Sequence, residues 1–299
     1  MSQNYVIVVD STSDLPSQLE QQWGIEILPF IFNLDGTEYY NYPDWRDISV
    51  RAFYDALRAG KTGTTTQVTS TRYIETWTPF LEAGKDVLYL CMSSALSGSY
   101  EQSLLAQREV AETFPERTVA CVDSRSASLG IGLLAHLAAK GRDEGKPLAE
   151  LAAELEKAVP RVQHWVMADD LQHLRRGGRV SGAAAFVGGM LSIKPVLHVY
   201  GNGKLAPMHK ARGRGKALDY LVEQMATFKP DPSYKTVYIA HSDAPDIADQ
   251  LKNMVVAKYG KREIVINDIG PVIGSHTGPG TIALIFLSEK ERIPAPGGK

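Results

Sequence analysis

The sequence has few of the features that mark secreted, metal-binding or membrane-spanning proteins. Only two of its 299 residues are cysteines, Cys91 and Cys121, and each ends an apolar run. A disulfide-rich secreted domain contains more cysteines, and a structural zinc site has them close together. No apolar run approaches the ~20 residues that cross a bilayer, and the N-terminus lacks the pattern of a signal peptide. We therefore expect reduced, buried cysteines, no transmembrane segment and a cytoplasmic location.

An excess of charge of either sign is also missing. The chain has 32 Lys and Arg residues against 34 Asp and Glu residues, so its formal net charge is -2. This balance gives no global electrostatic reason to bind nucleic acid or an anionic membrane. The well-known enzyme motifs are absent too: G-x-S-x-G, G-x-x-x-x-G-K-[ST], H-E-x-x-H and C-x-x-C do not occur.

Short apolar runs alternate with amphipathic stretches in the first half of the chain. Strands are predicted at Tyr5–Val9, Ile25–Asn33, Asp86–Cys91 and Thr118–Val122, and helices at Ser49–Ala59, Ser99–Phe114, Leu129–Glu144 and Pro147–Val159. Such alternation is typical of a parallel sheet covered by helices on both faces. Ligands of these folds bind at the edge of the sheet where strands lead into helices.

The pattern changes after about residue 160. Strands are predicted at Val162–Ala168, Lys194–Tyr200, Lys204–His209, Thr236–His241 and Glu263–Asp268, with helices at 215–228 and Ala244–Tyr259. A hairpin together with alternating helices indicates a smaller α/β (α+β) domain. We predict an N-terminal α/β domain over 1–160, a C-terminal domain over 161–290 and a flexible tail over 291–299.

Hydroxyl side chains crowd several predicted strand-to-helix loops, at residues 10–14, 62–67, 93–99 and 123–128. Helix capping accounts for one such residue per helix. The surplus hydroxyls and the free backbone N–H groups would suit a small anion such as a carboxylate or phosphate. This pattern alone is compatible with both helix capping and anion binding.

Two further segments could carry function. The Gly- and Pro-rich run 270–280 predicts a loop of fixed shape that holds His276, either as a structural group or close to a ligand. The basic runs 174–181 and 210–216 are either solvated charge or a surface for an acidic or phosphorylated partner.

Taken together, these motifs resemble the DegV family of bacterial lipid-binding proteins. The resemblance runs nearly from end to end and rests on the order and spacing of the segments 10–15, 93–100, 123–130, 174–179, 193–197, 241–245 and 274–280. It implies two α/β domains with one long-chain fatty acid, such as palmitate, stearate or oleate, buried between them. It also implies no cofactor, no metal and no catalysis by the chain itself.

The resemblance further implies roles for individual residues. Either Thr65 or Thr66, together with Ser94 and with Ser93 alongside, would hold the carboxylate, and His276 would stand behind them directly or through water. Family members of known role pass the bound fatty acid to a separate ATP-dependent fatty acid kinase, which makes the acyl phosphate for phospholipid synthesis. The candidate surface for that partner comprises Arg176, Arg179 and Arg212.

One segment departs from the family pattern. The family usually has Thr-Ser-Gln-Pro-Ser where this chain has Thr65-Thr66-Gln67-Val68-Thr69. Val68 lacks the fixed backbone angle of proline, so the roles of Thr65 and Thr66 are not assigned by the resemblance.

Two functions of other classes compete with the carrier. One is a hydrolase or phosphatase that uses Ser94 or Ser97 with His276, which acyl-ester turnover lost in Ser94→Ala would support. The other is a sensor of a small anion such as a phosphosugar, which tightly held phosphate without lipid would support. The absence of a nucleophile elbow counts against the first, and the scarcity of basic residues in the hydroxyl loops counts against the second.

Overall fold

The first half of the chain forms a parallel sheet between two layers of helices. The computed structural model describes residues 4–169, 171–180 and 193–295. The sheet has the order β2-β1-β6-β7 and all of its pairings are parallel. Its strands are β1 (Tyr5–Asp10), β2 (Ile25–Leu28), β6 (Asp86–Cys91) and β7 (Val119–Asp123). The predicted parallel sheet is therefore confirmed.

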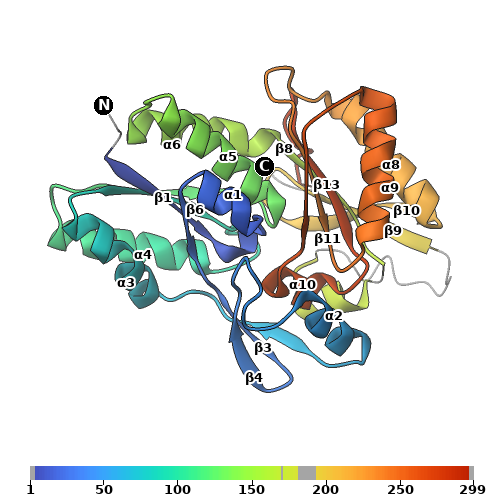
Figure 1. The fold of residues 1–299 in the computed structure, drawn as a ribbon, viewed down its shortest axis with the longest axis horizontal. Helices are drawn as coiled ribbons and strands as arrows, with labels where there is room; N and C mark the ends of the chain where they lie inside the picture. Colours follow the sequence, from blue (N-terminus) through green and yellow to red (C-terminus); the bar gives the residue numbers. More distant parts are fainter. Residues whose placement is uncertain (1–3, 170, 181–192, 296–299) are drawn as a thin grey trace.

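Helices cover both faces of this sheet. One face packs against α3 (Ser70–Glu82) and α4 (Ser99–Thr113), and the other against α5 (Leu129–Asp143), with α6 (Leu148–Ala158) beside it and α1 (Ser17–Gln22) nearby (Figure 1). Side chains alternate across the sheet as the pleat requires, so Val8 and Val87 face α3 and α4 while Ile7 and Leu88 face α5. Helix α3 had no prediction, because its Thr- and Pro-containing sequence gives a weak helical signal.

A larger, mostly antiparallel sheet occupies the second half. Its order is β10-β9-β8-β13-β11-β12, and β11 pairs parallel to β12. Its strands are β8 (Val162–Met167), β9 (Ile193–Val199), β10 (Leu205–Arg212), β11 (Val237–His241), β12 (Ile264–Asp268) and β13 (Ile282–Leu287). The outer face packs against α8 (Arg214–Phe228) and α9 (Pro245–Tyr259), and the inner face packs against α5 (Figure 1). Helix α5 is therefore shared by both sheets and joins the two halves into one core.

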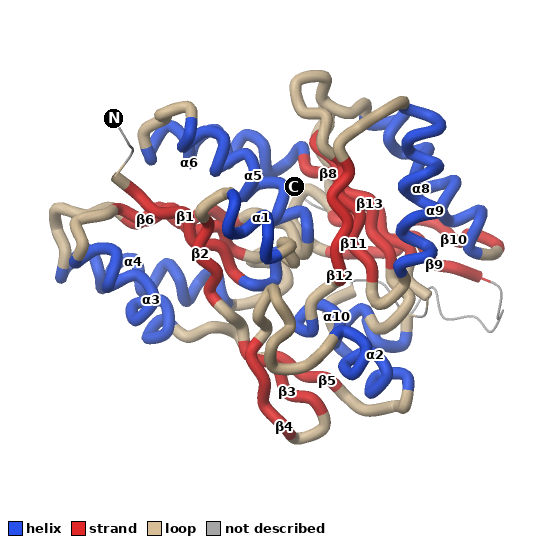
Figure 2. Tube along the Cα trace, in the orientation of Figure 1, coloured by secondary structure: helices blue, strands red, loops and turns tan. Residues whose placement is uncertain are grey.

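Below the two larger sheets in the view of Figure 2 lies a small assembly, of which the sequence predicted the helix at Ser49–Ala59 but not the remaining packing. It consists of the sheet β4-β3-β5 and three short helices, α2 (Val50–Arg58), α7 (Gln172–Gly177) and α10 (Pro271–Thr277) (Figure 2). The sheet is built from β3 (Ile31–Leu34), β4 (Thr37–Tyr40) and β5 (Gly63–Thr65). The expected single strand 25–33 is wrong: Pro29 separates β2 from β3, and the chain passes there from one sheet to another. The expected loop 270–280 instead contains helix α10.

The junction between the two larger parts lies around residue 160. Single 3-10 turns occur at η1 (Ser11–Ser13) and η2 (Val159–Arg161), and β8 follows η2 directly. The division at 160 stays a prediction, because the small assembly takes segments from both sides of it. Over the described residues, no helix is long and apolar enough to span a membrane.

The ordered chain continues further toward the C-terminus than expected. Within the predicted tail, Arg292 is only 3% exposed and donates hydrogen bonds to the carbonyl oxygens of Val159, Val162 and Arg125. Residues 296–299 lie outside the described part of the chain. The predicted tail therefore contains at least one buried residue, and its start at residue 291 stays a prediction.

Candidate functional site

A polar pocket of about 170 Å³ lies within the small assembly, where β5, α7 and α10 meet. It is lined by Lys61, Thr62, Gly63, Thr64, Thr65, His173, Arg176, Gly177, Arg179, Ser275 and His276. Hydroxyls, imidazoles and three cationic side chains make up this lining, and none of these residues carries a carboxylate. Such a lining favours a small anion over a cation.

Thr65 and His276, both predicted to contact the ligand, come together in this pocket. The Thr65 Oγ1 lies 2.8 Å from the His276 Nε2. Strand β5 pairs with β3 through Phe32 and Thr65, and this pairing fixes Thr65 opposite α10. His276 stands in the last turn of α10, beside α7.

Two glycines allow these elements to approach each other so closely. A Cβ on Gly63 would lie 2.3 Å from the Ser275 Oγ, and a Cβ on Gly177 would lie 2.3 Å from the His276 Nδ1. Neither distance is possible for a real side-chain atom, so only glycine permits this packing of β5 and α7 against α10. From the sequence, Gly63 and Gly177 could be recognised only as glycines in predicted loops, and not as sites of close packing.

The imidazole of His276 is neutral at physiological pH. Burial, and then the positive charge of Arg179, lower its pKa to about 4. Its Nδ1 is buried and has no hydrogen-bond partner among the described residues. We assign the proton to Nε2, which donates to the Thr65 Oγ1, because a proton on Nδ1 would be buried against Gly177 without an acceptor. The Thr65 hydroxyl hydrogen then remains available to a ligand oxygen.

The predicted partner surface divides into two places. Arg176 and Arg179 line the pocket and are exposed. Arg176 Nη2 lies 3.2 Å from the His173 Nδ1, and Arg179 Nη1 donates to the Gly177 carbonyl oxygen at 2.6 Å. Neither partner is a carboxylate, so both positive charges remain available at the pocket rim. Arg212 ends the edge strand β10, is exposed and does not line the pocket.

The remaining predicted ligands have other environments. Thr66 follows β5 and is exposed. The Ser94 hydroxyl donates to the Asp123 Oδ2 at 2.6 Å, and the buried Ser93 hydroxyl donates to the Gly203 carbonyl oxygen at 3.0 Å. Neither serine lines the pocket that contains Thr65.

The hydrogen bonds of Ser94, Ser97 and His276 show whether a serine is paired with the histidine, as a serine-dependent hydrolase requires. The Ser94 hydroxyl bonds to Asp123, the Ser97 hydroxyl lies 2.8 Å from the Ser99 hydroxyl, and the His276 Nε2 faces Thr65. No serine–histidine pair of the predicted kind therefore appears among the described contacts. The described part of the chain also contains no cluster of three or more His, Cys, Asp or Glu residues that could hold a metal ion.

Sequence reasoning missed several residues of the pocket. Lys61, His173 and Ser275 line it but carried no prediction as ligands. Ser275 could have been found from its place beside His276, whereas Lys61 and His173 reach the pocket only through the packing of β5 and α7. Ser181, which ends the predicted basic segment, lies outside the described residues.

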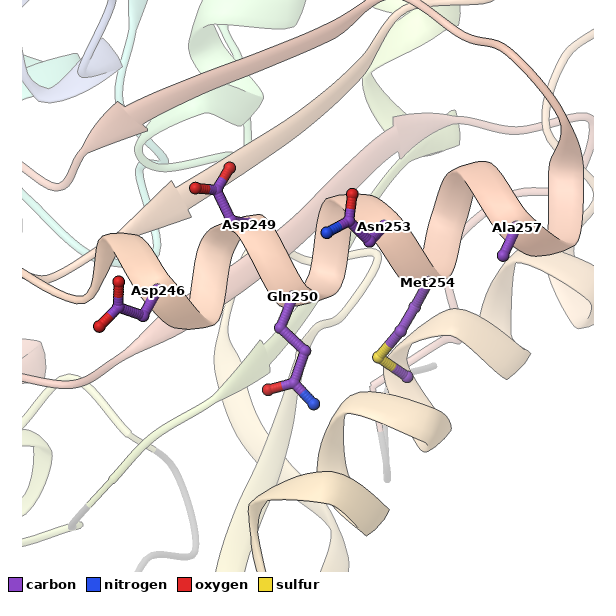
Figure 3. Close-up of a pocket in the computed structure, with 6 residues that line it drawn as sticks. All are labelled: Asp246, Asp249, Gln250, Asn253, Met254 and Ala257. Carbon is purple, nitrogen blue, oxygen red and sulfur yellow. The ribbon is translucent and has the colours of Figure 1, made fainter.

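A second hollow, of about 600 Å³, lies along the outer face of α9 beside α8 (Figure 3). It is lined by Asp246, Asp249, Gln250, Asn253, Met254 and Ala257. The two aspartates would repel a carboxylate or phosphate, and no predicted site residue is present. The pocket at β5, α7 and α10 is therefore the candidate site.

The fold and this site define an α/β protein with two large sheets and one small sheet, and with a cation-rimmed, hydroxyl-lined pocket built from both halves of the chain. A family model described as "Uncharacterised protein, DegV family" matches residues 4–289, and the chain belongs to the DegV family. A DegV domain-containing protein of Clostridium perfringens is 41% identical over 95% of this chain and 98% of its own length.

Solved structures agree with this assignment. A DegV family protein of Thermus thermophilus, described in terms of its fatty acid binding, is 33% identical with a TM-score of 0.84, over 95% of this chain and 99% of its own. DegV of Bacillus subtilis, described as a fatty acid binding protein, is 27% identical with a TM-score of 0.81, over 96% of this chain and 100% of its own.

Proposed function

We propose that this chain binds one long-chain fatty acid between its two domains, with the carboxylate in the pocket of Thr65 and His276. In this proposal the protein is a carrier that presents the carboxylate to a separate ATP-dependent fatty acid kinase for acyl-phosphate formation. The observation that carries it is the neutral Thr65–His276 pair at 2.8 Å in a pocket rimmed by arginines. The fatty acid binding of the Thermus thermophilus and Bacillus subtilis relatives supports the class of ligand.

The chemistry of the pair suits a carboxylate that must remain reactive. A hydroxyl donor holds one oxygen without neutralising its charge, whereas a buried bidentate arginine would occupy both oxygens. Arg176 and Arg179 at the rim are exposed and would attract the anion from solvent. Burial of the acyl chain, at ~0.8 kcal/mol per methylene, would supply most of the affinity.

The geometry favours Thr65 over Thr66 as the carboxylate ligand. Thr65 is half-buried in β5 and bonded to His276, while Thr66 is exposed beyond the strand. In the proposed complex Ser93 and Ser94 form a second set of hydroxyls that contact the ligand after their bonds to Gly203 and Asp123 rearrange.

Mass spectrometry of lipid extracted from the natively purified protein tests the ligand. We expect one fatty acid per chain and a rise in melting temperature when palmitate or oleate is added to delipidated protein. If no lipid is extracted and neither fatty acid raises the melting temperature, the carrier function is wrong.

A reconstituted reaction tests the partner. Loaded protein, a bacterial fatty acid kinase and ATP should yield acyl phosphate, and omission of the carrier should abolish it. The double variant Arg176→Glu/Arg179→Glu should slow this reaction at least tenfold with bound fatty acid still present. Arg72→Glu, an exposed arginine on α3, is the matched control and should behave as the wild type. Equal rates in all three proteins would refute the proposed partner surface.

A further inference from the structure

A buried aspartate in the segment between β1 and α1 reaches across to the start of α10. The Asp14 Oδ1 accepts a hydrogen bond at 2.8 Å from the backbone N–H of Gly270, which is the N-cap residue of α10. The Asn267 Nδ2 donates to the Asp14 carbonyl oxygen at 2.8 Å. Asp14 is 5% exposed. One residue of the N-terminal half thus holds the chain at both the end of β12 and the beginning of α10.

The other carboxylate oxygen of Asp14 is tied to a third element. The Ser128 hydroxyl, at the N-cap of α5, donates to the Asp14 Oδ2. Helix α5 is the helix shared by both sheets, so Asp14 is fixed against the most buried part of the molecule. The carboxyl group therefore positions the start of α10 relative to this shared core.

Helix α10 connects the segment held by Asp14 to the candidate site. It has seven residues, and His276 is the sixth. Gly270 and Gly274 are packed too tightly for side chains, against Asp14 and Asn41 at one end and against Tyr54 and Phe53 in the middle. The Tyr54 hydroxyl donates to the Ile269 carbonyl oxygen at 2.6 Å, just before α10. These contacts fix the helix at its start and in its middle, so a displacement at Gly270 would shift the end of α10 that carries His276.

We propose that Asp14 is a positioning residue for the ligand site, which acts through α10 to hold His276 against Thr65. The inference rests on the proposed function, and it concerns a residue that does not line the pocket. Asp10, on the same segment, provides the comparison. It is equally buried, but its carboxylate accepts from the N–H groups of Thr12 and Met92 and has no bond to α10.

The backbone and protonation state of Asp14 decide which substitutions are informative. Its φ of 51° lies in the left-handed region, which glycine and asparagine adopt at low cost. Burial raises its pKa to about 8, so the neutral acid predominates at pH 7. The ionised carboxylate accepts from the Ser128 hydroxyl, whereas the neutral acid carries its proton on Oδ2 and donates to the Ser128 oxygen. Asparagine reproduces the neutral form, since its oxygen can accept from Gly270 and its NH₂ can donate to the Ser128 oxygen.

The test compares Asp14→Gly, which removes the carboxyl and keeps the backbone, with Asp14→Asn. Two quantities are measured: the affinity for a fluorescent long-chain fatty acid, and the ¹⁵N chemical shifts of the His276 ring. Asp14→Gly should weaken binding about tenfold and shift both ring nitrogens, since the Nε2–Thr65 bond is lost. Asp14→Asn should match the wild type in both. Asp10→Asn should lower the melting temperature but leave the His276 shifts unchanged.

Each other outcome has a definite meaning. If Asp14→Gly lowers the melting temperature but leaves the His276 shifts and the affinity unchanged, Asp14 is merely structural and the proposal is overturned. If Asp14→Gly does not fold, Asn267→Ala removes only the amide that holds the Asp14 carbonyl oxygen. It should shift the same ring nitrogens by less, and unchanged shifts would overturn the proposal. If the wild type binds no fatty acid, the carrier function fails while the ring shifts still test the positioning role.

Discussion

At the scale of single residues, the site depends on a neutral imidazole paired with a hydroxyl. His276 is kept uncharged by burial and by the positive charge of Arg179, and its Nε2 faces the Thr65 Oγ1. A protonated imidazole would bind a carboxylate more tightly, but it would also draw charge from the oxygen that, in the proposed function, attacks a phosphate. The neutral pair orients the Thr65 hydroxyl as a hydrogen-bond donor without withdrawing charge from the carboxylate oxygen.

Removal of the Thr65 hydroxyl should weaken fatty acid binding, whereas removal of the Thr66 hydroxyl should not. We expect Thr65→Ala to raise the Kd about tenfold, because one hydrogen bond to a charged group is lost, and Thr65→Ser to retain most of the affinity. Thr66→Ala is the matched control, since Thr66 is the neighbouring residue and is exposed. Titration with a fluorescent fatty acid measures all three. If only Thr66→Ala raised the Kd, Thr66 and not Thr65 would be the carboxylate ligand.

His276 should make the protein less stable in mild acid. Its pKa is about 4 in the folded chain and close to its ordinary value of 6.5 in the unfolded chain. Between these values the unfolded chain binds the proton more readily, so the free energy of unfolding falls as the pH drops from about 6.5 to about 4. This contribution is on the order of 3 kcal/mol. Urea denaturation of wild type and His276→Asn at several pH values measures it. The difference in unfolding free energy between the two proteins should shrink toward pH 4, and a constant difference would contradict the assigned neutral state.

At the scale of secondary-structure elements, the site is a contact between three short segments. Strand β5 has three residues, α7 has six and α10 has seven. None of them would be stable alone, because short helices and isolated strands lose more conformational entropy than their own hydrogen bonds recover. They exist because each packs against the others, and close packing at Gly63 and Gly177 brings Thr65 to His276.

A methyl group at the contact of α7 with α10 should displace the imidazole. Gly177→Ala would place its Cβ 2.3 Å from the His276 Nδ1, so the ring or helix α7 must move. We expect at least a tenfold loss of fatty acid affinity and a modest fall in melting temperature. Gly215→Ala in α8 is the control, because a Cβ there meets open space and alanine favours a helix. Equal affinity in the two variants would show that the contact does not set the ligand geometry.

The sequence predicted most of the long elements but not these short ones. The strands Tyr5–Asp10 and Asp86–Cys91 and the helix Leu129–Asp143 have continuous apolar patterns, so local sequence is enough to predict them. Strand β5 has no such pattern and is formed only by pairing with β3. Helix α10 contains a proline and a glycine, which predict a loop, and is stabilised by Asp14 and Tyr54 from distant parts of the chain.

For the candidate site, the sequence predicted residue types but not the hydrogen-bond partner of each residue. Either Thr65 or Thr66 was expected beside His276 from the resemblance, and in the structure Thr65 lies within hydrogen-bond distance of it. The same resemblance placed Ser93 and Ser94 beside them. In the structure these serines bond instead to Gly203 and Asp123. A residue type in a motif indicates which chemistry is possible, but the partner of each hydroxyl depends on segments far apart in sequence.

At the scale of the whole molecule, the two halves are joined by α5 and by Arg292 of the C-terminal segment. The Arg292 guanidinium is buried, and its hydrogen-bond partners among the described residues are neutral: the carbonyl oxygens of Val159, Val162 and Arg125, and the Ser126 hydroxyl. Burial lowers its pKa to about 9, which still leaves it charged at pH 7. One side chain thus satisfies acceptors at the start of β8 and in the loop after β7.

Loss of Arg292 should therefore loosen both halves together. We expect Arg292→Ala to lower the free energy of unfolding by about 2–4 kcal/mol, since it leaves several buried acceptors without a donor. Lys290→Ala is the control from the same segment, because the Lys290 side chain is exposed and donates to the Thr227 carbonyl oxygen, while its backbone contacts survive the substitution. Urea denaturation gives the free energies, and hydrogen exchange locates the change. Exchange should quicken in the loop 123–128 and at the start of β8. Asp123, at the start of this loop, accepts a hydrogen bond from the Ser94 hydroxyl, which we propose as a ligand contact. If exchange quickens only in β8, Arg292 does not stabilise this part of the proposed site.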